Sequence, residues 1–178
     1  MNYLLTKRGK LSVTRPEAID KLCKSYSLYF DIERYDDDPR PLAATFFMHT
    51  HSEKYVLVKK AKIWEADSNE YVYLFSIPHL TKELFLECRD FAYKDGMEHI
   101  EPGPNHMVSY ITALFLCDTC DADAVKALKR TYIYKSFKLA FHGWMDFHTG
   151  LIELSTGKTA ANSSGRSTAQ LLKKTLLK

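Results

Sequence analysis

The sequence contains few of the residues and runs that mark low-complexity, collagen-like or membrane-spanning chains. Seven glycines and six prolines among 178 residues exclude collagen-like and low-complexity classes. No stretch approaches the roughly 18 unbroken apolar residues that a membrane-spanning helix needs. Residues 1–10 lack the apolar segment of a secretory signal peptide. A cytoplasmic location and no membrane partner are therefore expected.

The motifs of two common enzyme classes are also missing. Thr156-Gly157-Lys158-Thr159 contains a Gly-Lys-Thr, but Ile152 stands where a phosphate-binding loop needs its first glycine. No Gly-x-Ser-x-Gly nucleophile elbow occurs. Neither activity is expected.

The four cysteines do not indicate a disulfide framework, because no export signal is present. Cys23 and Cys88 lie on the apolar stripes of predicted helices. Cys117 and Cys120 form a C-x-x-C between a predicted strand and a predicted helix, the place of a thioredoxin-like site. A redox role is disfavoured because nearby carboxylates raise thiol pKa values, and three surround this pair: Asp118, Asp121 and Asp123.

The chain has enough apolar surface for one folded core. Hydrophobic residues make up 46% and aromatic residues 13%. Domains usually contain roughly 100–200 residues, so residues 1–178 are expected to form a single domain. Hydrophobic periodicity predicts helices from Pro16 to Phe30, over 81–95 and over 122–131, and strands over 42–51, 54–66, 70–77, 107–117, 132–145 and 151–155, with a final helix, or alternatively a strand, from Ser167. Thr14 and Glu17 have the spacing of a capping box at the first helix, and Gly96 is expected to end the second. Turns are expected at 52–53, 67–69 and 148–150.

This order, α-β-β-β-α-β-α-β-β-(α), predicts an α+β or mixed α/β fold with a single central, mostly antiparallel sheet flanked by helices. Residues 70–77 are apolar on both faces, which predicts helices on both sides of the sheet. Restriction-endonuclease-like cores share the helix, three-strand, helix, strand order. The acidic-x-Lys pair that their active members use is absent, so only an inactive relative that binds through the same core remains open.

The segment His49-Thr50-His51-Ser52-Glu53 is the first candidate site. In an extended strand His49, His51 and Glu53 would share the face opposite Phe46 and Met48. Two imidazoles and a carboxylate suit a divalent metal with open positions, such as Zn²⁺ or Fe²⁺. A hairpin turn at 52–53 would instead swing Glu53 away, leaving an ordinary polar strand end.

The second candidate is a ligand or partner site at His142, Trp144, Asp146 and His148. The first three share one strand parity, so an aspartate could orient a histidine while the indole shelters a ligand. The alternative is a structural aromatic with satisfied polar neighbours. Lys135 and Lys138 precede this segment and are included in the predicted site.

Charge is distributed unevenly along the chain. Residues 121–178 carry 10 basic and 4 acidic side chains, whereas residues 1–120 carry 15 basic and 18 acidic ones. A basic part can bind phosphate backbones, although a solvated lysine-rich surface explains the same numbers. Nucleic acid or a protein is the partner that this part predicts.

Several segments resemble small uncharacterised bacterial proteins: residues 134–138, His142-Gly143-Trp144, Thr156-Gly157-Lys158 and Asn162, extending to 54–64, 106–107 and 110–112. This resemblance implies a bacterial, cytoplasmic origin and no mechanism. Together with the residue patterns, it favours a binding or interaction module of unknown role, associated with nucleic acid. The alternative is a metal-dependent hydrolase using His49, His51 and either His106 or His148.

Overall fold

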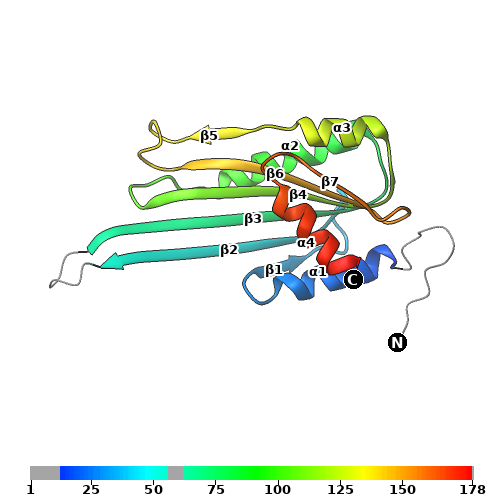
Figure 1. The fold of residues 1–178 in the computed structure, drawn as a ribbon, viewed down its shortest axis with the longest axis horizontal. Helices are drawn as coiled ribbons and strands as arrows, with labels where there is room; N and C mark the ends of the chain where they lie inside the picture. Colours follow the sequence, from blue (N-terminus) through cyan, green and yellow to red (C-terminus); the bar gives the residue numbers. More distant parts are fainter. Residues whose placement is uncertain (1–12, 56–61, 178) are drawn as a thin grey trace.

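The computed structural model describes residues 13–55 and 62–177, excepting the side chains of 52–55 and 62–66. Three consecutive strands follow the first helix and three more precede the last one (Figure 1). The elements are α1 (Arg15–Tyr26), β1 (Asp31–Arg34), β2 (Leu42–Tyr55), β3 (Lys62–Leu80), α2 (Lys82–Glu98), β4 (His106–Cys120), α3 (Ala122–Arg130), β5 (Tyr134–Ser136), β6 (Trp144–Glu153), β7 (Lys158–Ala161) and α4 (Arg166–Leu176).

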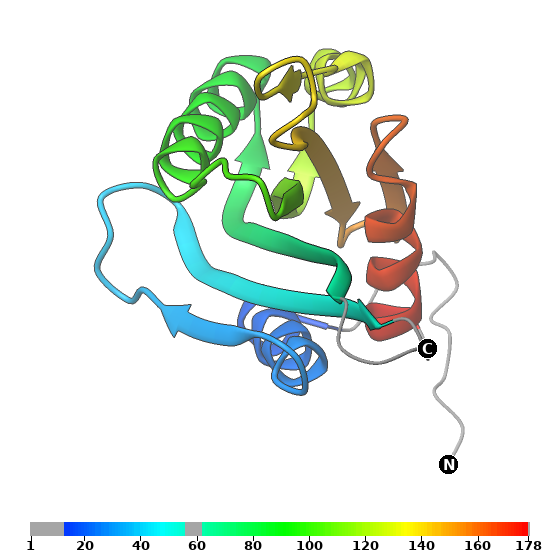
Figure 2. The same ribbon diagram turned by 90° about the vertical axis from the view of Figure 1, so that its left-hand side faces the viewer.

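The elements form three layers, with one sheet between two pairs of helices (Figure 2). On one face α1 and α4 bury an apolar cluster that includes Leu22, Leu114 and Leu172. On the other face α2 and α3 bury a larger cluster around Phe85 and Phe115. The expected α+β class with helices on both faces is confirmed.

The expectation of a mostly antiparallel sheet is wrong, because the sheet is mixed. Its order is β1-β2-β3-β4-β6-β5, with β7 also paired to β6. The long central pairings β3–β4 and β4–β6 are parallel. Helix α2 connects β3 to β4, and α3 lies between β4 and β6, which provides the crossovers that parallel neighbours require.

The expected turns at 52–53 and 67–69 are also wrong, since β2 continues to Tyr55 and β3 runs unbroken from Lys62 to Leu80. Asp67, Ser68 and Asn69 pair with β2 and β4 within the ladder. Cross-strand bonds satisfy their backbone groups, which overrides their local turn preference. Two strands, β2 and β3, therefore occupy the range in which three were predicted, and β1, which was not predicted, precedes them.

The helices cannot cover the sheet over its full length. The 19 residues of β3 span about 60 Å, whereas the 17 residues of α2 span about 26 Å. Accordingly, the ends of β2 and β3 near residues 55 and 62 extend past α1, α2 and α4 in Figure 1. Both faces of the sheet therefore carry side chains that no helix covers.

The predicted strand over 132–145 is interrupted by a turn at 137–143, between β5 and β6. Lys138, Leu139 and Ala140 in this turn have φ values of 46°, 54° and 68°. The left-handed region costs an L-residue roughly 1–2 kcal/mol, so this turn stores backbone strain. The predicted turn at 148–150 is absent because β6 continues to Glu153.

The start of α1 follows the prediction, whereas its end at Tyr26 comes before the predicted Phe30, and the start of α4 also differs. Thr14 and Glu17 form the expected capping box. Helix α4 begins one residue before the predicted Ser167, with Gly165 as its N-cap and no side-chain cap bond. Gly96 lies inside α2 instead of ending it. Close packing against β4 explains the glycine, since a Cβ there would come within 2.8 Å of Ile111 Cδ1.

Candidate functional site

The α2 face of the sheet contains two adjoining pockets beyond the end of the helix. An outer pocket of about 400 Å³ lies between the β2–β3 ladder and the loop after α2. An inner pocket of about 360 Å³ lies over β1, β2 and β3. Both are lined by Tyr71 and His99, and we call the two together the acidic groove. Its lining also includes His49, Asp67, Asn69, Glu101 and His106 in the outer pocket, and Glu33, Tyr35, Thr45, Phe47, Tyr73 and Asp95 in the inner one.

Three stacked rings connect the two pockets. Tyr71 stacks on Phe47 with ring centroids 5.0 Å apart, and on His99 with centroids 5.8 Å apart. The Tyr71 hydroxyl donates a 3.0 Å hydrogen bond to the His99 carbonyl oxygen, which fixes the ring. Phe47 remains partly exposed, so the stack offers an aromatic surface to a ligand.

The acidic groove has an excess of negative charge. Glu33, Asp67, Asp95 and Glu101 line it, and none of the described residues lining either pocket is lysine or arginine. Burial, followed by the charge of Glu101, raises the pKa of Tyr71. Such a site favours a cation, above all one with a flat or apolar body that can lie on aromatic rings.

The histidines predicted to bind metal lie at the rim of this groove. Register pairs His49 with Asn69 and His51 with Asp67, so both histidines share one face, as expected. Nδ1 of His51 lies 2.5 Å from Oδ1 of Asp67, and Nδ1 of His49 lies 2.6 Å from Oδ1 of Asn69. The side chain of Glu53 lies outside the described residues.

Among the described side chains, these contacts give the metal prediction no support. In the described part of the chain, no group of three or more His, Cys, Asp or Glu side chains is placed to hold a metal ion. His106 has both ring nitrogens engaged, with Nδ1 2.7 Å from the His142 carbonyl oxygen and Nε2 2.9 Å from Ser109 Oγ. The metal-dependent hydrolase therefore gains no support.

The second predicted site separates into two parts. Asp146 and His148 lie on the α1/α4 face, with Asp146 Oδ2 3.7 Å from His148 Nε2, and register places Trp144 on the same face. His142 and Lys138 lie in the turn before β6. Lys135 pairs with Met145, so it lies on the opposite face.

Neighbouring strands add residues that the sequence did not suggest. Tyr110 lies between Glu70 and Asp146 in one cross-strand row. Its ring stacks on His148 with centroids 4.9 Å apart. We call Glu70, Tyr110, Asp146 and His148 the polar row. The sequence gives little signal for either residue, since Glu70 ends the polar run 67–70 and Tyr110 is one of several strand aromatics. Parallel pairing brings Tyr110 beside both Glu70 and Asp146.

The environment of the polar row shifts two protonation equilibria in opposite directions. Burial raises the pKa of Glu70. Burial lowers the pKa of His148, against the charge of Asp146. The Thr112 hydroxyl, on the adjoining row, is buried without a hydrogen-bond partner. An acidic and a basic side chain whose pKa values are shifted in this way are typical of functional sites.

The C-x-x-C pair does not form a reactive thiolate. Burial raises the pKa of Cys117, and burial together with the Glu153 carboxylate raises that of Cys120 to about 11. All four cysteines are free. A raised thiol pKa opposes redox chemistry at neutral pH. The first cause is burial and not the aspartates that the sequence suggested.

Comparison with known proteins gives a family but no activity. A family model described as Domain of unknown function (DUF8052) matches residues 14–174. No curated protein and no solved structure matches the chain. No helix in the described ranges is long and apolar enough to cross a membrane.

Proposed function

The chain belongs to the DUF8052 family, whose description assigns no activity, and from its geometry we propose a single-domain binding module whose acidic groove takes an organic cation. The observation that carries the proposal is the coincidence of two adjoining pockets and four carboxylates, with no lysine or arginine among the described residues of the lining. A pocket with a few converging polar groups is the usual form of a small-molecule site.

The shape of the groove supports an extended cation. The outer pocket has Asp67 and Glu101, and the inner pocket has Glu33 and Asp95. Tyr71 and His99 line both pockets, and Phe47 of the inner pocket stacks on Tyr71. A ligand with two amino or guanidinium groups joined by an apolar spacer would meet a carboxylate pair at each end and aromatic surface in the middle.

Calorimetric titration with a linear diamine, a diguanidine and a dicarboxylate of equal length tests this function. The two cations should bind and the dicarboxylate should not. Asp67→Asn and Glu101→Gln should each weaken binding about five- to tenfold, which corresponds to about 1–1.4 kcal/mol. Glu87→Gln removes a charge of the same sign from the exposed surface of α2 and should leave affinity unchanged.

Phe47→Ala separates the aromatic contribution from the electrostatic one. It should weaken binding of cations with an apolar spacer more than binding of ammonium salts without one. Equal affinity for the dicarboxylate, or equal losses in Glu87→Gln and Asp67→Asn, would show that the groove does not select cations.

The finer predictions from the sequence stay proposals. Free thiols at all four cysteines support a reducing compartment such as the cytoplasm. A bacterial origin rests on the resemblance of residues 134–138 and 142–144. The exposed basic side chains of α3, Lys126, Lys129 and Arg130, support an anionic partner, for which nucleic acid is the hypothesis from the sequence.

A further inference from the structure

The turn at 137–143 is held in a strained conformation by a rigid base. Phe137 N donates to Gly143 O at 2.9 Å, and His142 N donates to Phe137 O at 3.1 Å, which closes the turn. The Phe137 ring meets the His106 ring edge-to-face at 5.6 Å. Gly143 has φ 74°, and a Cβ there would collide with the Met107 carbonyl oxygen. The left-handed residues 138–140 therefore extend from an anchored base.

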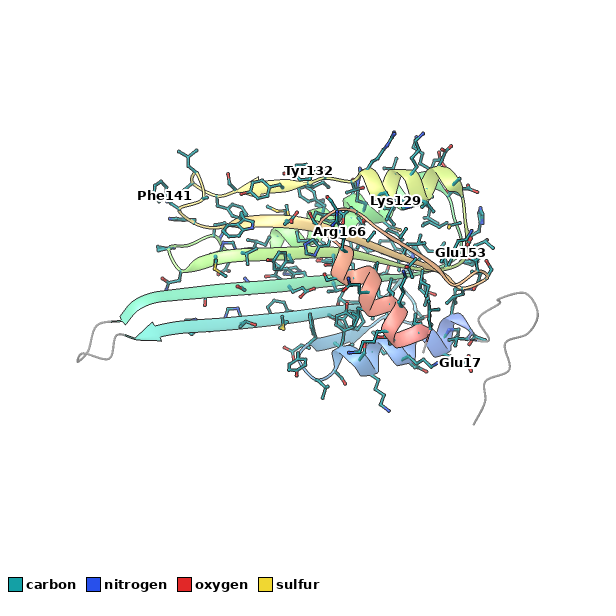
Figure 3. The ribbon with its side chains drawn as sticks, in the orientation of Figure 1. Glu17, Lys129, Tyr132, Phe141, Glu153 and Arg166 are labelled. Carbon is teal, nitrogen blue, oxygen red and sulfur yellow. The ribbon has the colours of Figure 1, made fainter. Side chains whose placement is uncertain are left out.

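The strained turn displays large apolar side chains. Leu139 is 89% exposed and Phe141 is 80% exposed. Figure 3 shows Phe141 pointing away from the body of the molecule, along the same edge as Tyr132 and Lys129. Tyr132 is 72% exposed and Tyr134 is also exposed. Backbone strain that places apolar groups in water indicates a function for the segment and not a packing requirement.

Along the chain segment that carries these apolar groups, the charged side chains have a single sign, although Asp146 of the neighbouring strand pairs with Tyr134. From Ala124 to Met145 the chain contains no aspartate or glutamate but five basic residues: Lys126, Lys129, Arg130, Lys135 and Lys138. The Lys135 ammonium lies 5.8 Å from the centroid of the Phe137 ring, beside the base of the turn. A partner that matches this edge would carry negative charge for the basic side chains and an apolar region for the exposed rings and Leu139.

We propose that this edge binds an anionic lipid surface, with Leu139 and Phe141 inserted below the headgroups and the five basic residues against them. Exposed apolar side chains next to lysines are the elements of interfacial binding. Leu139 has no ring on which a nucleobase could stack, so it favours lipid over nucleic acid. The sequence-based expectation of no membrane partner rested on spanning segments, and insertion of a turn needs none.

Co-sedimentation with vesicles tests the proposal. The full chain should bind vesicles of phosphatidylcholine with phosphatidylserine at low salt, and much less those of phosphatidylcholine alone. The double variant Leu139→Ser/Phe141→Ser should lose at least about tenfold in affinity. Leu28→Ser/Tyr29→Ser is the matched control, because those residues are 78% and 75% exposed just after α1. It should bind like the unchanged protein.

A fluorescence measurement distinguishes insertion from surface charge. The emission of Phe141→Trp should shift to the blue on anionic vesicles and should not shift on single-stranded or duplex oligonucleotides. Lys135→Gln/Lys138→Gln should weaken vesicle binding and make its salt dependence shallower. The urea unfolding curve of this variant should match that of the unchanged protein. The proposal is overturned if the protein does not bind anionic vesicles, or if it binds only oligonucleotides. It is also overturned if the Leu28/Tyr29 control variant loses as much vesicle affinity as the Leu139/Phe141 variant. Cation binding in the acidic groove is independent of each outcome.

Discussion

Tyr110 stacks on His148, with ring centroids 4.9 Å apart and ring planes 28° apart. The stack belongs to two parallel strands, β4 and β6, and it covers a histidine whose Nε2 lies 3.7 Å from Oδ2 of Asp146. Burial opposes charging of this imidazole, and the pKa of His148 is lowered.

The lowered pKa of His148 predicts acid sensitivity. The unfolded chain takes up a proton near the ordinary histidine pKa of about 6.5, whereas the folded protein takes it up only at lower pH. Stability should therefore fall as pH drops below about 6.5, and this loss should end below the pKa of the folded state. His148→Gln should lack this part of the loss in urea unfolding at about pH 7.5 and about pH 5. His79→Gln, at an exposed position, is the control; an equal effect there would contradict the prediction.

Glu70 should have the opposite dependence. Burial raises its pKa, so the folded protein retains a proton that the unfolded chain releases near pH 4.3. Stability falls as pH rises from about 4.3 through the raised pKa, and each unit of difference corresponds to about 1.4 kcal/mol. Glu70→Gln should therefore be more stable than the unchanged protein at pH 7, with the gain vanishing near pH 4. A constant gain across pH, or a similar one in the exposed Glu87→Gln, would refute this.

Asn162 should be among the costliest side chains to truncate. Its Oδ1 accepts from Thr149 N at 3.0 Å and Gly165 N at 2.8 Å, and its Nδ2 donates to Thr131 O and Phe147 O. Asn162→Ala leaves these buried groups unpaired, each at about 1–3 kcal/mol. We expect a loss of about 3 kcal/mol or more by chemical denaturation. Ser163→Ala, at the exposed neighbouring position, should cost less than about 0.5 kcal/mol.

The Cys120 thiol should react slowly with iodoacetamide at neutral pH. Burial first, and then Glu153, raise its pKa to about 11. Glu153→Gln should lower this pKa and speed alkylation, while burial keeps the rate below that of a free thiol. Mass spectrometry identifies the modified residue, and Cys120→Ser should remove the signal. Equal rates with and without Glu153 would show that its charge does not act on the thiol.

The helices and the layer arrangement could be predicted because they rest on local patterns. The capping box at Thr14 and Glu17 and the two-sided apolar run at 70–77 need no knowledge of distant residues. The strand β1 was missed because Asp31–Arg34 is a polar, mostly exposed edge. Turn-forming residues at 67–69 concealed the continuity of β3, since pairing on both sides outweighs local preference.

The candidate sites could likewise be predicted only where they depend on local sequence patterns. His49 with His51, and Asp146 with His148, share faces because alternation along one strand is local. Their distant partners depend on strand register: Asp67 reaches His51 across β2 and β3, and Tyr110 reaches His148 across β4 and β6. The acidic groove could not be predicted, because its carboxylates come from β1, α2, β3 and the loop after α2.

The first and last helices share one apolar cluster, in which Leu22 of α1 and Leu172 of α4 are both fully buried. During synthesis, the side chains that α4 covers remain in contact with water until residues 166–176 have left the ribosome and folded. A nascent chain in which α4 has not yet formed therefore presents a hydrophobic surface suited to chaperone capture. Docking of α4, and not emergence of the sheet, closes this side of the core.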